Sequence, residues 1–285
     1  MKHVFWSSRP VSWINTAYPF AAAYFMVTRR LDLTFWIGTL FFLIPYNLLM
    51  YGVNDVFDYE SDLRNPRKGG IEGALLPKEI HRTVIWSAIL SCLPFVVYLF
   101  IVGNIASDLW LALFLFTVVA YSAKHLRFKE KPLLDSLTSA SHFVGPMIFG
   151  LALNSVDLSK PPITAIITSF TLWGMASHAF GAVQDVKADR EGSISSIATY
   201  FGARATTRSA LVMYLAAGFY LLSIGWPQNL VSLATVPYVL ILLPHLNITD
   251  ETCETANRGW RRFIWLNFFA GFVVTMVLIY SAISL

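Results

Sequence analysis

Residues 54–62 read Asn-Asp-Val-Phe-Asp-Tyr-Glu-Ser-Asp and end an apolar segment, about 34–56, that is long enough to cross a bilayer. Asn54, Asp58 and Asp62 are four residues apart, so a continuous helix would align their side chains on one stripe about 12 Å long. Stacked carboxylates repel one another unless a cation lies among them, and Mg²⁺ prefers such oxygen ligands together with phosphate oxygens. The stripe therefore favours a magnesium site for a diphosphate over a solvated helix end, because acids at the end of a membrane helix are commonly functional.

The composition is that of a protein that crosses a membrane several times. The chain has 285 residues, of which 56% are hydrophobic and 13% charged, and its mean hydropathy is +0.57. These values exclude an ordinary soluble domain. The two cysteines lie in an apolar segment (Cys92) and in a polar loop (Cys253), so they indicate neither a disulfide framework nor a metal motif.

Apolar runs predict nine transmembrane helices. They cover about residues 11–28, 34–56, 83–102, 109–123, 134–154, 163–182, 209–225, 230–244 and 263–285. Prolines inside several of them predict kinks, since neighbouring groups in a membrane protein can satisfy the freed carbonyls.

The basic residues are distributed unevenly over alternate loops. Of the 21 Lys and Arg residues, all but Arg29, Arg30 and Lys160 fall on the side of the N-terminus. Because positive residues accumulate on the cytoplasmic side, this bias predicts a cytoplasmic N-terminus, cytoplasmic acidic motifs and an external C-terminus. It also explains the net charge of +4 without a nucleic-acid partner.

A second acidic pair, Asp185 and Asp189, follows the sixth predicted helix. It lies 127 residues after Asp58 and Asp62, at the same offset that relates Asn54 to Gly181. Four predicted helices separate the two motifs, so both halves have the same orientation. The sequence therefore predicts an all-α integral membrane fold, with two four-helix halves in a parallel repeat plus a ninth helix, in a single domain over 1–285. Two acidic motifs on one side of the membrane could bind a diphosphate through metal ions.

Two polar residues are predicted about two turns deeper in the membrane than the acids. Tyr51 precedes Asp58 by seven residues, and His178 precedes Asp185 by seven. They could line an apolar substrate cavity. For a single membrane histidine, an interhelical hydrogen bond is the more common role.

Basic loops follow the first motif and the fourth predicted helix. Arg67 and Lys68 lie in a loop with Asn-Pro and Gly-Gly turns, and Lys124 follows Tyr121 at the end of that helix. Arginine and lysine side chains bind phosphate oxygens, so these three cations are candidates for diphosphate binding. The cytoplasmic bias of basic residues is the simpler explanation for other cations in the same loop.

Two further groups of charged residues are given no site role. Arg127 and Lys131 are interpreted as lipid-facing or as topological signals. The acids of residues 247–254 lack the four-residue spacing and are interpreted as a solvated loop.

These motifs resemble those of the UbiA-type intramembrane prenyltransferases, whose pattern NDxxDxxxD on one helix and DxxxD on another is met by residues 54–62 and 185–189. The likeness covers nearly the whole chain. Within the family it is greatest to the lycopene elongases of C50 carotenoid biosynthesis, on residues 8–20, 54–73, 126–130, 181–186 and 195–199.

The resemblance implies Mg²⁺-dependent transfer of a C5 unit from dimethylallyl diphosphate to the ends of lycopene, giving C45 and C50 carotenoids in the cell membrane. The product would end by proton loss or by capture of water, and a carotenoid cyclase could act downstream. The implied metal ligands are Asn54, Asp58, Asp62, Asp185 and Asp189. The four aspartates and Tyr121 are the implied catalytic residues.

Other functions stay open at this level. A family member acting on an aromatic acceptor, such as a quinone precursor, would need a polar pocket, for which Arg9 and Asn15 are candidates. A cation-coupled transporter would place ionisable groups near the bilayer midplane and often has an inverted repeat, whereas the acids here lie at helix ends. A purely structural membrane subunit would explain neither acidic motif.

Overall fold

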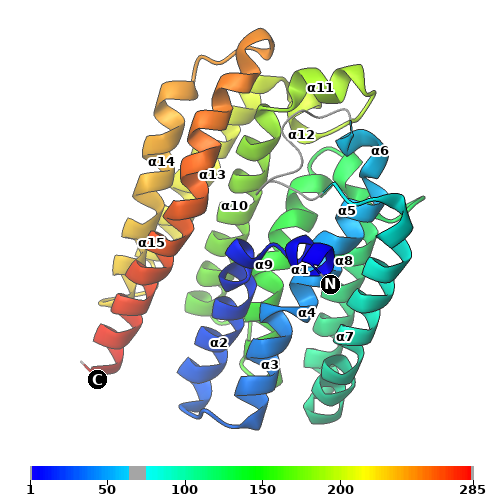
Figure 1. Cartoon of the computed structure of the whole chain (residues 1–285). Helices are drawn as coiled ribbons and strands as arrows, with labels where there is room; N and C mark the ends of the chain where they lie inside the picture. The colour runs from blue at the N-terminus through cyan, green and yellow to red at the C-terminus, as the bar shows by residue number, and fades with distance from the viewer. Residues whose placement is uncertain (1, 64–74, 284–285) are drawn as a thin grey trace. The chain divides into compact units, whose positions relative to one another are not determined.

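The computed structural model describes residues 2–63 and 75–283, apart from the side chains of Ser61 and Asp62. In this part of the chain all regular structure is helical (Figure 1). Eight segments in it are long and apolar enough to cross a membrane, namely Leu33–Phe57, Lys78–Val102, Ile105–Ser122, Leu134–Leu153, Pro161–Val183, Ala203–Leu222, Gln228–His245 and Asp250–Ile283. The predicted all-α membrane class is confirmed. The predicted count of nine is not matched in full, because the first predicted segment forms a helix, α2, of only 15 residues.

The helices differ in regularity along the chain. In chain order the elements are α1 (Lys2–Ser7), η1 (Pro10–Ser12), α2 (Ile14–Thr28), α3 (Leu33–Leu43), α4 (Pro45–Asn47), η2 (Leu48–Gly52), α5 (Val53–Phe57), α6 (Tyr59–Asp62), η3 (Lys78–Ile80), α7 (His81–Val102), α8 (Ile105–Ser122), η4 (Phe128–Glu130), α9 (Leu134–Leu153), α10 (Pro161–Val183), α11 (Val186–Glu191), α12 (Ile197–Phe201), α13 (Ala203–Leu222), η5 (Gln228–Thr235), α14 (Val236–Leu242), η6 (Leu243–His245), η7 (Asp250–Ala256) and α15 (Asn257–Ile283). Predicted and observed boundaries differ by a few residues at most ends.

The chain divides into two compact units. Unit 1 comprises Met1–Phe128 and Ser141–Val156, and unit 2 comprises Lys129–Ala140 and Asp157–Leu285. Helix α9 therefore contributes its first turns to unit 2 and the rest to unit 1. The expectation of a single domain over 1–285 stays a prediction.

Aromatic side chains fill the core of unit 1. The ring of Phe20 lies 5.2 Å from that of Phe42 and 6.0 Å from that of Phe149, and all three residues are buried. Helices α2 and α3 approach closely at Gly38, where a Cβ atom would overlap the Phe20 ring. A residue without a side chain is required there for the two helices to pack.

The segment that leads to the first acidic motif is irregular. Pro45 lacks the N–H that would continue α3, and residues Leu48–Gly52 form a π-helical turn. The Asn47 amide donates to the carbonyl oxygens of Phe42 (2.8 Å) and Leu43 (3.1 Å), and to the Thr16 hydroxyl (2.6 Å). These bonds satisfy buried carbonyls at the irregular turn, as a membrane interior requires.

Unit 2 is built around the pair α10 and α13. The Ser169 hydroxyl donates to the carbonyl oxygen of Ala217 (2.8 Å), and the hydroxyls of Ser177 and Tyr214 are 2.9 Å apart. Such hydrogen bonds and close backbone approach, more than apolar burial, hold helices together in lipid. Unit 2 thereby holds α10, the helix that leads to the second motif, in a fixed place.

Candidate functional site

Each acidic motif contains an aspartate at a helix break. Asp58 follows α5 with φ −97° and ψ 0°, and Asp185 follows α10 with φ −97° and ψ −4°. This bridge conformation is common at functional sites. The acids are thus not on one uninterrupted helix as expected, since α6 and α11 start anew after each break. The two break residues, 127 positions apart, have nearly the same dihedral angles, and the parallel repeat stays a prediction.

In unit 1 the Asn54 amide orients the Asp58 carboxylate. Its Nδ2 donates to Oδ2 of Asp58 (2.8 Å) and to Oγ of Ser122 on α8 (2.8 Å). The amide nitrogen is occupied in this way, so the amide oxygen and the carboxylate are the groups suited to a hard cation. Asp58 itself is only 5% exposed.

Arg127 is a site residue that the sequence interpretation missed. Its Nη2 lies 3.9 Å from Oδ1 of Asp58. A tight turn after α8, with positive φ at His125 (74°) and Arg127 (38°), returns the chain toward the motif. The expectation that Arg127 faces lipid was wrong, because this turn brings its guanidinium beside the buried Asp58 carboxylate, whereas a topological role stays a prediction. Lys124 is exposed just beyond the end of α8, and Tyr121 is half-buried with its ring 5.3 Å from that of His142.

Asp55, the second residue of the motif, is held away from solvent by Arg9. Its side chain is 0% exposed, and its Oδ1 lies 2.9 Å from Nη2 of Arg9. The Arg9 guanidinium also lies 4.3 Å from the centre of the Tyr51 ring, in a cation–π contact. The ring of Tyr51, predicted to line an apolar cavity, thus packs against the arginine of this ion pair.

In unit 2 a buried amide network surrounds the break before Asp185. The Gln184 side chain donates to the carbonyl oxygen of Gly181 (3.0 Å) and accepts from the Asn257 amide (2.6 Å). Gln184 is 6% exposed. The network links the end of α10 to the start of α15 and fixes where Asp185 leaves the helix. Asp185 and Asp189 are half-buried, and the Asp189 N–H donates to the carbonyl oxygen of Asp185 (2.8 Å).

His178 forms the interhelical contact that is common for membrane histidines. Its Nε2 lies 3.7 Å from Oδ2 of Asp135, which is 0% exposed. Asp135 also accepts from the backbone N–H groups of Ser136 and Ile197, both at 2.6 Å. An acid at the start of a membrane helix was the signal that could have identified Asp135.

Of the acids near residue 250, Glu251 and Glu254 are exposed as expected of a solvated loop, whereas Asp250 is half-buried. Asp250 accepts from Arg190 on α11 (2.6 Å) and from the backbone N–H of Ala203 at the start of α13 (2.7 Å). The solvated-loop interpretation was therefore wrong for Asp250, which pairs with residues far away in the sequence that local spacing does not reveal.

Three predicted site groups lie outside the described residues: Arg67, Lys68 and the side chain of Asp62. Among the side chains that are described, no three His, Cys, Asp or Glu residues gather closely enough to hold a metal. The oxygen donors that are described, an amide oxygen and carboxylates at two helix breaks, are of the kind that Mg²⁺ accepts.

The fold and the paired motifs define a helical membrane enzyme of the intramembrane prenyltransferase class. A model of the UbiA prenyltransferase family matches residues 12–282, and the chain belongs to this family.

Relatives of known name agree with this placement, and a solved structure has a similar fold. The chain is 52% identical over 273 residues to a protein named lycopene elongase/hydratase from Corynebacterium glutamicum, covering 96% of this chain and 95% of that protein. It is 52% identical over 281 residues to the C(50) beta-cyclic carotenoids biosynthesis protein LbtBC of Dietzia sp., covering 98% of this chain and 65% of the longer protein. Its fold is similar to that of a UbiA homologue from Archaeoglobus fulgidus solved with DMAPP and Mg²⁺, with a TM-score of 0.67, 18% identity and coverage of 96% and 99% of the two chains.

Proposed function

We propose that this prenyltransferase transfers a C5 unit from dimethylallyl diphosphate to the ends of lycopene and so forms C45 and C50 carotenoids. The observation that carries the proposal is the 52% identity, over nearly the full length of both chains, to a protein named lycopene elongase/hydratase. The family match spans both units, which supports treating residues 1–285 as one functional domain.

The proposed diphosphate site uses the residues of both motifs. Asn54, Asp58 and Asp62 on one motif, and Asp185 and Asp189 on the other, would hold Mg²⁺, which when bound neutralises charge on the diphosphate. Arg67, Lys68 and Lys124 remain the proposed cations for the phosphate oxygens, and Arg127 joins them because it lies beside Asp58.

The proposed reaction breaks the C–O bond of the allylic diphosphate, and the electron pair leaves with the diphosphate. The terminal double bond of lycopene then forms the new C–C bond, and the resulting tertiary cation loses a proton or captures water. Tyr121, half-buried at the end of α8, would face the allylic group, and aromatic faces stabilise such cations. Exclusion of water by apolar side chains protects the first cation. Tyr51 and His178 stay proposed as lining of the apolar substrate cavity.

The Arg9–Asp55 pair supports an apolar acceptor. An aromatic acid acceptor would need a free cation for its carboxylate, and Arg9 was the candidate for that role. Its charge is instead matched by a buried carboxylate at 2.9 Å. Lycopene, a hydrocarbon, needs no such cation.

Two further parts of the proposal concern the orientation of the chain in the membrane and the enzyme that acts on its product. The motifs and the N-terminus would face the cytoplasm and the C-terminus the outside, which the distribution of basic residues supports. A carotenoid cyclase would act on the product downstream. The name of the Dietzia relative refers to β-cyclic carotenoids, and that protein is longer than this chain.

The test is the carotenoid content of lycopene-producing bacterial cells that express the chain, measured by chromatography and mass spectrometry. C45 and C50 products are expected with the native chain and with Asp157→Asn, a matched change in an exposed loop, and are expected to be absent with Asp58→Asn. Unchanged lycopene in cells with well-expressed native protein would contradict the proposed acceptor.

A further inference from the structure

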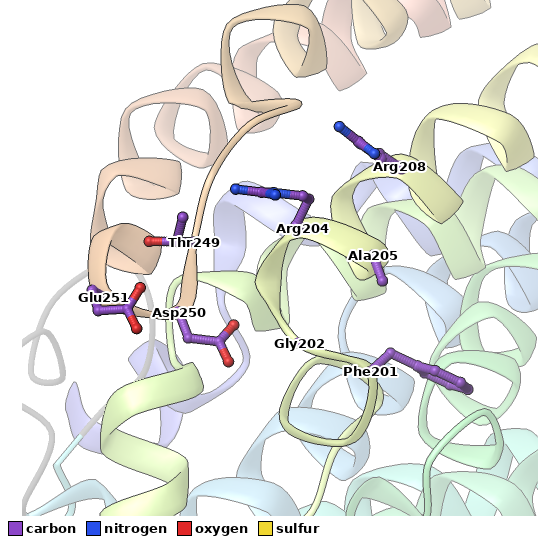
Figure 2. Close-up of a pocket in the computed structure, with 8 residues that line it drawn as sticks. All are labelled: Phe201, Gly202, Arg204, Ala205, Arg208, Thr249, Asp250 and Glu251. Atoms are coloured by element: carbon purple, nitrogen blue, oxygen red, sulfur yellow. The ribbon is translucent and has the colours of Figure 1, made fainter.

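A pocket of about 660 Å³ lies in unit 2, between the start of α13 and the segment that follows η6 (Figure 2). It is lined by Phe201, Gly202, Arg204, Ala205, Arg208, Thr249, Asp250 and Glu251. None of these residues belongs to the proposed metal or diphosphate site, so the pocket calls for a separate explanation.

One wall of the pocket is cationic. Arg204 and Arg208 are four residues apart on α13 and therefore share a helix face. Figure 2 shows both side chains extending from α13 toward the segment that carries Thr249. Arg208 is held by hydrogen bonds to the carbonyl oxygen of Leu246 and to Oδ1 of Asn247, both at 3.2 Å. Arg204 is exposed and has no ion pair or hydrogen bond within the described part of the chain.

The opposite wall of the pocket contains two acids, Asp250 and Glu251, which limit the negative charge that a ligand can carry. Asp250 is already paired with Arg190 and with the backbone of Ala203, whereas Glu251 is exposed. Arg190, Arg204 and Arg208 lie beside two carboxylates, and Lys187 also interacts with Glu251, so positive charge is in excess. An anionic group is therefore favoured beside Arg204 and Arg208, and a singly charged one meets less repulsion from Glu251 than a doubly charged one.

The outer surface of α13 continues from this pocket into the membrane. From residue 210 to the end of α13 the exposed side chains are hydrophobic, with Val212 63% exposed, Leu215 53% and Phe219 74%. Their spacing of three and four residues places them in one row on the helix surface. Since α13 is long and apolar enough to span the bilayer, the two arginines lie where headgroups begin and the row lies beside acyl chains.

We propose that this pocket binds the phosphodiester group of an anionic membrane phospholipid. The phosphate is held by Arg204 and Arg208, headgroup hydroxyls donate to Glu251, and the acyl chains lie along Val212, Leu215 and Phe219. The general accumulation of basic residues on one side of the membrane explains positive charge in this region. It does not explain a pocket in which Arg208 is held by hydrogen bonds, Arg204 is exposed and Glu251 lies on the opposite wall.

The experiment uses the detergent-purified full chain and native mass spectrometry with phosphatidylglycerol and phosphatidylcholine of identical acyl chains. Phosphatidylglycerol is expected to bind more tightly. Arg204→Gln should weaken its binding roughly fivefold, the scale of one cation near a membrane surface. Glu251→Gln should strengthen it, because the amide oxygen still accepts from a headgroup hydroxyl while the negative charge that repels the phosphate is removed. Arg261→Gln, an equal charge loss at an exposed position on α15, should leave it unchanged.

Three results would overturn the inference. Equal binding of the two lipids would remove the role of the negative charge. Equal weakening by Arg204→Gln and Arg261→Gln would show diffuse attraction in place of a pocket. Displacement of phosphatidylglycerol by millimolar inorganic phosphate would assign the pocket to a free anion. Because none of the three variants alters the proposed reaction site, the outcome is independent of the carotenoid assay.

Discussion

Replacing Arg9 by Met should destabilise unit 1 because it leaves the Asp55 carboxylate buried without its cation. The Asp55 side chain is 0% exposed and that of Arg9 is 19% exposed, so the pair is largely shielded from water. Removing one member of a buried pair costs about 3–5 kcal/mol, and the partial exposure of Arg9 favours the lower end, about 3 kcal/mol. For a protein of this size that corresponds to a fall in Tm of roughly 6–12 °C.

The assay is thermal unfolding of the purified protein in detergent, followed by tryptophan fluorescence. Arg82→Met, at an exposed position on α7, is the matched control and should change the free energy of unfolding by no more than about 0.5 kcal/mol. The double variant Arg9→Met with Asp55→Leu should recover most of the loss, because apolar replacement of a whole buried pair is often neutral. A Tm for Arg9→Met equal to that of the control, or a double variant less stable than the single one, would refute the reasoning.

Three further changes test other parts of the molecule. Asp185→Asn should abolish prenyl transfer while Tm stays within a few degrees, and full activity would exclude a role in metal binding. Asn257→Leu removes the hydrogen bond that the buried Gln184 side chain accepts, so it should raise the Mg²⁺ concentration for half-maximal activity about tenfold in an Mg²⁺ titration. An effect on expression alone would argue against a role of Asn257 in positioning Asp185. Gly174→Val should lower stability by about 1–3 kcal/mol, because a Cβ at Gly174 would lie 2.8 Å from that of Ala140; an unchanged Tm would mean that α9 and α10 can separate there.

The membrane helices could be predicted from the sequence because their signal is local. Long apolar runs and the alternation of basic loops depend only on neighbouring residues. The short length of the first predicted segment has a physical reason. Residues 10–12 form a 3₁₀ turn, with Arg9 in the left-handed region (φ 50°), so the first apolar run yields only the 15 residues of α2.

The acidic motifs were identifiable, but their backbone was not. Four-residue spacing assumes an unbroken helix, whereas the chain breaks at Asp58 and Asp185. Asp58 is followed by Tyr59 and Asp185 by Val186, so neither Pro nor Gly marks the break in the sequence. The break became visible only through its dihedral angles.

Contacts between distant residues account for the remaining differences. Arg127 reaches Asp58 across 69 positions of sequence, and Asp135 meets both His178 and the backbone of Ile197. Each pair joins residues that are far apart in the sequence, so helical periodicity contains no information about it. Arg9 and Asp55 are another pair of distant residues that the sequence did not reveal. Their pairing supports an apolar acceptor over an aromatic acid.

The most direct test of the proposed function is a reaction of the purified chain with ¹³C-labelled dimethylallyl diphosphate and lycopene. With Mg²⁺ present, the account predicts C45 and C50 products that carry one and two labelled C5 units. It also predicts their loss when the metal is chelated, and in Asp58→Asn protein of native Tm. Labelled products formed equally well by Asp58→Asn, or unchanged after chelation, would contradict it.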